Sequence, residues 1–216
     1  MQIFLDSIDL PEIKKYHDFG VLDGITTNPS LMSNSKVDFY NTVLAICEIT
    51  KGHVSVEVAA NDFEGMIQEG NKILNIAPNI VIKLPMTWDG LKACKYFDAR
   101  GSKVNMTLCF SENQALLAAK NGATYISPFI GRLEDINEDG MMLIKNIRNI
   151  YDNYSFKTKI LAASIRTTDH VYESALYGAH AATIPVAVLS KLVMHNLTDI
   201  GLSKFNADWA KSGMKI

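Results

Sequence analysis

Cysteine is rare in this sequence, and its three copies, Cys47, Cys94 and Cys109, lie far apart. They form no C-x-x-C pair, and an odd number of cysteines cannot be fully paired within one chain. Both observations argue against a disulfide framework and against a zinc knuckle. The five histidines are scattered as well, so the sequence predicts no metal site. We expect a reduced, cytoplasmic protein.

Charge of one sign is not concentrated anywhere in the chain. Over 216 residues the formal net charge is −2, and the longest basic clusters are pairs such as Lys14-Lys15. Nucleic acids and anionic membranes usually bind to a basic patch, so we expect neither as a partner. No apolar run approaches the roughly 20 residues of a membrane span. The first ten residues, "MQIFLDSIDL", have no basic region before their apolar residues, so we expect no signal peptide.

What the sequence does contain is a repeated pattern of short β-branched segments, each followed by a stretch with helical apolar spacing. The strand candidates are residues 2–6, 23–27, 54–58, 80–84, 104–108, 124–128, 159–164 and 180–185. Helices are expected near 9–18, 38–50, 62–76, 88–98, 111–121, 138–152, 168–178 and 186–195. Eight such units predict an α/β fold, a single (β/α)8 TIM barrel over residues 1–216. An open doubly wound sheet is the alternative, although G-x-G-x-x-G and Walker motifs are absent.

A further helical segment, 199–213, falls outside the eight repeats. It carries Leu202, Phe205 and Trp209 on one face. Such a stripe most often packs on its own domain. The alternative is that this C-terminal helix docks on a neighbouring subunit.

Four prolines mark the carboxyl ends of predicted strands, because a residue without an N–H ends a ladder at little cost. They are Pro29, Pro85, Pro128 and Pro185. In a barrel this end is the catalytic face, and side chains two apart on a strand point the same way. The candidates there are Asp6, Thr26, Asn28, Glu57, Lys83, Asn105, Thr107, Ser127, Phe129, Ser164 and Arg166, with Arg132 just beyond the sixth strand. A single Asp or Asn at a strand end is more often a cap or turn residue, but here seven strands converge.

Lys83 stands in the apolar run "NIVIKLP", where Ile82 and Leu84 should face the helices and the lysine should point into the barrel. Burial disfavours the charged form of a lysine, and a neutral amine attacks carbonyl groups. The alternative is a structural ion pair with Asp6 or Glu57, and the two interpretations are compatible. An imine on Lys83 would allow metal-free aldol chemistry, with Asp6 and Glu57 moving protons.

Arg132, Ser164 and Arg166 follow the sixth and seventh strands, next to where many barrels hold a phosphate. An arginine fork binds phosphate with two parallel hydrogen bonds. The alternative for Arg132 is a surface ion pair with Glu134 or Asp135.

Long segments of the chain resemble the transaldolases, in particular their compact bacterial and archaeal branch. They are "GITTNPSL" at 24–31, "VIKLPMTWDGLKA" at 81–93, "VNMTLCFSENQALLAAKNGATYISPFIGRL" at 104–133 and "ILAASIR" at 160–166. The resemblance implies a (β/α)8 barrel that needs no cofactor and binds sugar phosphates. It also implies a homo-oligomer, a pentamer or decamer, in which the C-terminal helix covers a neighbour.

The resemblance assigns roles residue by residue. Lys83 forms the Schiff base with the ketose, and Asp6 takes the proton of its C4 hydroxyl as the C3–C4 bond breaks. Glu57 and Thr107 orient a water during imine formation and hydrolysis. Asn28, Asn105 and Ser127 hold the dihydroxyacetone enamine, and Arg132, Ser164 and Arg166 bind the phosphate. Thr26 and Phe129 are further residues that we expect to contact the substrate.

The implied reaction belongs to the non-oxidative pentose phosphate pathway. It moves dihydroxyacetone from sedoheptulose 7-phosphate or fructose 6-phosphate to glyceraldehyde 3-phosphate or erythrose 4-phosphate. The rival within the family is fructose 6-phosphate aldolase, which releases free dihydroxyacetone and typically has glutamine in place of Glu57 and tyrosine in place of Phe129. A phenyl ring cannot hold the water that protonates the enamine, so these residues favour transaldolase. A catalytically idle barrel that only binds sugar phosphates is the alternative of another class.

Overall fold

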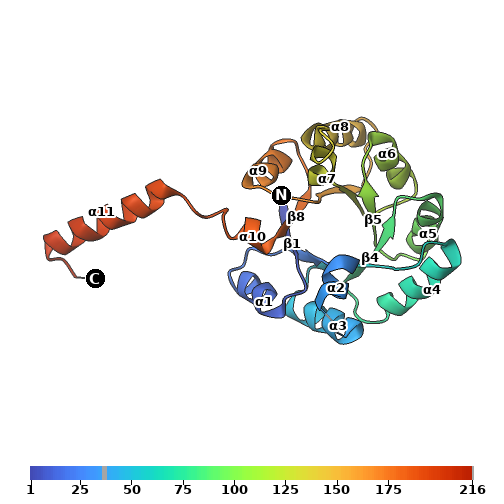
Figure 1. Ribbon diagram of the computed structural model, residues 1–216, viewed down its shortest axis with the longest axis horizontal. Coiled ribbons are helices and arrows are strands. Elements are labelled where there is room, and N and C mark those ends of the chain that lie inside the picture. The colour runs from blue at the N-terminus through green and yellow to red at the C-terminus, as the bar shows by residue number, and fades with distance from the viewer. Residues whose placement is uncertain (36–37, 216) are drawn as a thin grey trace.

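Eight parallel strands close into a barrel in the order β1-β2-β3-β4-β5-β6-β7-β8, surrounded by helices (Figure 1). The computed structural model describes residues 1–35 and 38–215. The strands are β1 Gln2–Asp6, β2 Gly24–Thr26, β3 His53–Glu57, β4 Ile80–Pro85, β5 Val104–Cys109, β6 Tyr125–Pro128, β7 Lys159–Ala162 and β8 Ala181–Pro185. The predicted (β/α)8 barrel is confirmed, and the open sheet is excluded by the pairing of β1 with β8. Residues 36, 37 and 216 of the predicted domain lie outside the described residues.

The outer helices largely follow the predicted ranges. They are α1 Leu10–Asp18, α3 Phe39–Ile49, α4 Phe63–Leu74, α5 Trp88–Asp98, α6 Glu112–Lys120, α8 Gly140–Asn153, α9 Thr168–Leu176 and α10 Val186–Leu189. Side chains such as Asp9, Asp62, Thr87 and Thr167 cap these helices by accepting a backbone N–H of the first turn. The caps fix where each helix begins behind its strand.

Two short helices were not predicted, α2 Pro29–Ser35 and α7 Ile130–Glu134. Segments of 7 and 5 residues are too short to show a helical apolar period. Both follow directly after strands, β2 and β6, so they lie at the carboxyl-end mouth of the barrel.

The core has two layers, as the alternation along β4 predicted. Ile82 and Leu84 belong to the larger layer between the strands and the helices. Val81, with Phe4, Tyr125, Leu161 and Ala181, forms the smaller cluster of inward-facing residues. Lys83 lies on the same face of β4 as Val81, so its side chain enters the barrel from the carboxyl end.

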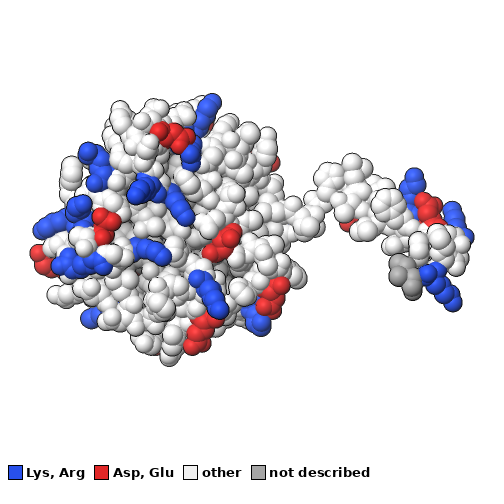
Figure 2. Space-filling view, turned by 180° about the vertical axis from the view of Figure 1, so that it is seen from behind, with Lys and Arg blue, Asp and Glu red and all other residues white. Residues whose placement is uncertain are grey.

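The last helix leaves the barrel. The helix predicted over 186–195 is shorter than expected and ends at Leu189. A new helix, α11 Asn196–Ser212, begins where the ring of His195 accepts the N–H of Leu197. Figures 1 and 2, which show opposite faces, both place α11 clear of the barrel. On the face shown in Figure 2, Lys and Arg predominate over Asp and Glu on the side of the barrel away from α11.

The apolar stripe on α11 is exposed: Leu202 at 55%, Phe205 at 69% and Trp209 at 44%. It therefore does not pack on its own barrel, which was the commoner expectation for such a stripe. The predicted range 199–213 is close to the observed helix, which begins at Asn196. No helix among the described residues is long and apolar enough to span a bilayer.

Candidate active site

A cavity of about 300 Å³ opens at the carboxyl ends of the strands. It collects side chains from all but one of the predicted positions, although these are distributed over most of the chain. The described lining residues are Asp6, Thr26, Asn28, Pro29, Ser30, Glu57, Lys83, Asn105, Thr107, Leu108, Ser127, Phe129, Arg132, Ala163, Ser164 and Thr183. Parallel strands end at one edge, so short sequence motifs far apart in the chain meet there.

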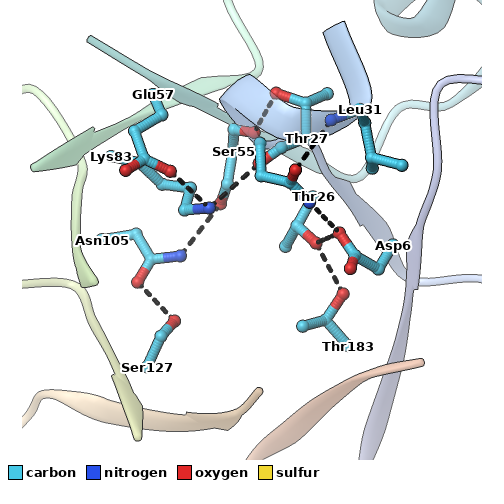
Figure 3. A network of polar contacts seen from close by, with 11 residues as sticks. Asp6, Thr26, Thr27, Leu31, Ser55, Glu57, Lys83, Asn105, Ser127 and Thr183 are labelled. Carbon is cyan, nitrogen blue, oxygen red and sulfur yellow. Dashed lines mark hydrogen bonds and ion pairs between the residues drawn. The ribbon is translucent and has the colours of Figure 1, made fainter. Parts of the chain in front are cut away.

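Lys83 lies on the cavity wall with 5% of its surface exposed. Its Nζ is 2.9 Å from Glu57 Oε2 and donates a hydrogen bond to the carbonyl oxygen of Thr27 at 2.9 Å. Glu57 and Lys83 are register partners on β3 and β4, which places their side chains side by side (Figure 3). The predicted ion pair with Glu57 is therefore confirmed, and Lys83 also lines the cavity.

Asp6 is held by two donors at the end of β1. Its Oδ1 accepts hydrogen bonds from Thr26 Oγ1 at 3.0 Å and from Asn28 Nδ2 at 3.3 Å. Asn28 also accepts the N–H of Leu31 and so begins α2. Burial raises the pKa of Asp6, an effect only partly offset by the charge of Lys83 and by the two hydrogen bonds. The raised pKa suits a carboxylate that must take up a proton.

Thr183 on β8 extends this network and was not predicted. Its Oγ1 is 2.6 Å from Thr26 Oγ1. Because Thr26 gives its only hydrogen to Asp6, Thr183 must donate to Thr26. The sequence contained a signal for it, because Thr183 stands two residues before Pro185, as Lys83 stands two residues before Pro85.

Polar side chains from β3, β5 and β6 are linked beside the lysine. Ser127 Oγ donates to Asn105 Oδ1 at 2.8 Å, and Asn105 Nδ2 donates to Ser55 Oγ at 3.3 Å (Figure 3). All three residues are buried. Ser55, which was not predicted, thus fixes the amide of Asn105 with its oxygen toward Ser127.

Thr107 is 1% exposed, yet its Oγ1 has no hydrogen-bond partner among residues 1–35 and 38–215. A buried hydroxyl without a partner is costly, so this one is well suited to bind a polar group of a ligand or a water. The next residue, Leu108, has φ +58°, beside a register shift between β5 and β6. Such a backbone is unfavourable for leucine by about 1 kcal/mol, and strain of this kind is concentrated at functional sites.

The predicted phosphate-binding residues divide into two groups. Arg132 on α7 and Ser164 after β7 line the cavity. Arg166 is the predicted position not among the described lining residues, because its guanidinium forms a two-pronged ion pair with Asp135. That ion pair holds the pKa of Asp135 below its usual range. Asp135 was considered as a partner of Arg132, but it pairs with Arg166.

Phe129 closes one side of the cavity. Its ring packs edge to face on Phe110, with centroids 5.7 Å apart. The wall at this point is therefore apolar and offers no hydroxyl. The described residues contain no group of three or more His, Cys, Asp or Glu side chains arranged to hold a metal ion.

Known proteins resemble this chain over its whole length. A family model described as transaldolase/fructose-6-phosphate aldolase matches residues 3–216. The probable transaldolase of Brucella ovis is 59% identical and that of Paracoccus denitrificans 55% identical, each over 216 residues and the whole of both chains. A solved thiamine phosphate pyrophosphorylase from Pyrococcus furiosus has a TM-score of 0.59 at 13% identity over 85% of each chain, a likeness of fold alone. The chain belongs to the transaldolase/fructose-6-phosphate aldolase family.

Proposed function

We propose that this protein is a transaldolase that transfers a dihydroxyacetone unit from a ketose phosphate to an aldose phosphate through a Schiff base on Lys83. The observation that carries the proposal is the buried amine of Lys83, which faces a cavity and touches a carboxylate. The donors are sedoheptulose 7-phosphate or fructose 6-phosphate, and the acceptors are glyceraldehyde 3-phosphate or erythrose 4-phosphate. The reaction needs no cofactor and belongs to the pentose phosphate pathway, which places the protein in the cytoplasm.

In the first step Lys83 attacks the ketone carbon of the donor. Glu57, 2.9 Å away, accepts the proton that the ammonium must lose. It then returns a proton to the hydroxyl of the carbinolamine, which leaves as water and yields the imine. The unpartnered hydroxyl of Thr107 holds that water on the cavity wall.

Cleavage follows on the other side of the cavity. Asp6 takes the proton of the C4 hydroxyl, the C3–C4 electron pair moves toward the protonated imine, and an enamine and an aldehyde form. Asn28 and Thr26 keep the Asp6 carboxylate in place. Asn105 and Ser127 are positioned to bind the hydroxyl groups of the remaining three-carbon unit.

The fate of the enamine distinguishes transaldolase from fructose 6-phosphate aldolase. An enamine that meets a well-placed water is protonated and released as dihydroxyacetone. Phe129 presents only an apolar ring at the position where the aldolases have a tyrosine hydroxyl. The enamine therefore survives until the acceptor aldehyde arrives, and the same steps run in reverse.

The phosphate of either sugar binds to Arg132, Ser164 and Arg166. Arg166 has to exchange its partner Asp135 for the phosphate, which an exposed ion pair permits because water and salt screen it. We further propose that the protein is a homo-oligomer, a pentamer or decamer, in which α11 packs on a neighbouring subunit. The exposed stripe on α11 supports this assembly.

Borohydride reduction with fructose 6-phosphate tests the Schiff base. We expect a mass increase on the peptide that contains Lys83, and its absence would leave only a sugar-phosphate-binding barrel. Cleavage of fructose 6-phosphate is then measured with and without erythrose 4-phosphate. Turnover that depends on the acceptor fits transaldolase, whereas equally fast cleavage without it would identify the aldolase.

A further inference from the structure

The two segments that carry the phosphate-binding candidates touch through their main chains. Gly131 N donates to Ser164 O at 3.1 Å, and Ile130 N donates to Ala163 O at 3.0 Å. A Cβ on Gly131 would lie 2.5 Å from Ser164 O and 2.6 Å from Arg166 Nε, so only glycine permits this approach. The position of α7 therefore depends on the position of the loop between β7 and α9.

Ser164 has φ +56°, a left-handed conformation that is unfavourable for serine. A strained backbone persists only where surrounding contacts fix it. The loop that presents Ser164 to the cavity thus requires support from its neighbours.

His170 supplies this support from the first turn of α9. The residue is 7% exposed, and its Nδ1 accepts a hydrogen bond from Arg166 N at 3.2 Å. Its Nε2 lies 2.9 Å from Oε2 of Glu134, which is the last residue of α7. One imidazole ring therefore bridges the loop of Ser164 and Arg166 to the helix of Arg132.

The contacts determine which ring nitrogen of His170 carries a hydrogen. A backbone N–H only donates, so Nδ1 must be the bare acceptor. The remaining hydrogen is then on Nε2, where it points at the Glu134 carboxylate. A carboxylate that fixes the tautomer and orientation of a histidine is a common way to position the group on the other side of the ring.

We propose that His170, oriented by Glu134, is a positioning residue for phosphate recognition: it holds the main chain of Arg166, and through it Ser164, in place relative to Arg132. The proposal rests on the proposed function, because it concerns the phosphate half of that site. His170 is buried and both of its ring nitrogens are engaged, by Arg166 N and by Glu134, so in this proposal it touches neither the substrate nor the reacting atoms. Its effect is on the affinity for phosphate and not on the chemistry at Lys83.

Two substitutions of His170 separate positioning from simple filling of space. His170→Asn places an amide oxygen close to the position of Nδ1 and keeps an acceptor for Arg166 N. His170→Leu fills similar volume without an acceptor and removes the hydrogen bond that holds the N–H of Arg166, which weakens phosphate binding by about tenfold. Glu134→Ala removes the carboxylate that contacts His170. The Glu134 side chain is 40% exposed, so this substitution leaves the buried core intact.

The first measurement is the binding of inorganic phosphate by calorimetry, which does not depend on catalysis. We expect the Leu variant to bind about tenfold more weakly. The Ala variant of Glu134 and the Asn variant of His170 should lie between it and the wild type, because each keeps an acceptor for Arg166 N but loses the contact between His170 Nε2 and Glu134. Circular dichroism and thermal melting check that each variant is folded. If His170→Leu does not fold, Glu134→Ala and His170→Asn still decide the outcome.

The second measurement compares substrates with and without phosphate. With fructose 6-phosphate and erythrose 4-phosphate, His170→Leu should raise KM by about tenfold and leave kcat near the wild-type value. With fructose and glyceraldehyde, its kcat/KM should equal that of the wild type. A matching loss with both substrate pairs, or wild-type phosphate binding by His170→Leu, would overturn the proposal.

Failure of the proposed function is distinguishable from failure of this inference. If the wild type binds phosphate and the variants behave as expected, but borohydride traps nothing on Lys83, then only the transaldolase proposal fails. If the wild type does not bind phosphate, or if Glu134→Ala binds as well as the wild type, the role of the bridge is refuted even where Lys83 forms an adduct.

Discussion

Glu57 and Lys83 occupy the same register position on neighbouring strands, and their charged groups lie 2.9 Å apart inside the barrel mouth. The Lys83 side chain is 7% and the Glu57 side chain 14% exposed, so the pair is largely removed from water. Removing one member of such a pair leaves the other charge buried without a partner and lowers the free energy of unfolding. Replacing both members by neutral groups lowers it much less. The pair therefore links stability to chemistry in a way that can be measured.

Lys83→Met should abolish the borohydride adduct and lower the free energy of unfolding by about 3 kcal/mol, because Glu57 is left buried without its partner. The double variant Lys83→Met/Glu57→Gln should recover most of this loss and remain inactive. Urea unfolding provides the measurement, and Lys95→Met, which changes an exposed lysine, is the control. A double variant less stable than Lys83→Met would contradict the coupling.

Asp6→Asn separates imine formation from cleavage. The amide keeps the shape of the carboxylate and its contact with Thr26, so borohydride should still trap the donor on Lys83. Without the base, cleavage of fructose 6-phosphate should slow by about 10²- to 10⁴-fold. The raised pKa of Asp6 means that its ionised form costs stability at neutral pH. The variant should therefore be at least as stable as the wild type. If the variant cleaves fructose 6-phosphate as fast as the wild type, Asp6 is excluded as the base.

Phe129→Tyr should increase the release of free dihydroxyacetone in the absence of an acceptor by about tenfold, because a hydroxyl can hold the water that protonates the enamine. Dihydroxyacetone is measured with a coupled reductase. Phe110→Tyr is the matched control, since Phe110 packs against Phe129 but does not line the described cavity. Equal release by both variants would show that the ring of Phe129 does not protect the enamine.

Much of this site follows from two rules, alternation along strands and prolines at strand ends. They place Lys83, Glu57 and Asp6 correctly because each is fixed by its own strand. The same rules reach Thr183, which was not predicted although Pro185 marks the end of β8. The barrel itself was predictable because the apolar period repeats with each βα unit.

Other features depend on partners that lie far away in the chain. The carbonyl of Thr27 holds the Lys83 amine, but every residue has a carbonyl, so no sequence pattern reveals it. The side chain of Arg166 turns toward Asp135 on a different element, which strand alternation does not describe. The path of α11 away from the barrel also cannot be read from its apolar stripe, because a stripe does not specify what it packs against.

The amino-end face of the barrel should make stability depend on pH. His53 Nε2 lies 2.8 Å from the ammonium of Lys103. Burial first, and then the charges of Lys103 and Lys159, lower the pKa of His53. The pKa of His180 is lowered by burial and then by Arg148 and Lys159. As the pH falls, these two histidines bind protons at a higher pH in the unfolded chain than in the folded protein. The stabilisation that is present above about pH 6.5 is therefore lost as the pH falls through the pKa values of the folded state.

His53→Gln should therefore lose less stability than the wild type between pH 7.5 and pH 5.5, values chosen to span the ordinary histidine pKa of about 6.5. Urea midpoints at both pH values give the comparison. The control is His17→Gln, since His17 is exposed on α1. A His53→Gln variant whose stability falls as steeply as that of the wild type would show that this histidine does not contribute to the acid sensitivity.

The exposed stripe on α11 should hold the assembly together. Each of Leu202, Phe205 and Trp209 leaves a large apolar surface in water, and burying such a side chain is worth about 2 kcal/mol. Removing the chain after His195 should therefore reduce the sedimentation coefficient to that of a smaller species, and Phe205→Asp should weaken assembly in the full-length chain. Lys204→Glu changes charge on a different face of the same helix and should leave assembly intact. A truncated protein that sediments as the same oligomer would refute a role for α11, because the remaining barrel surface would then suffice.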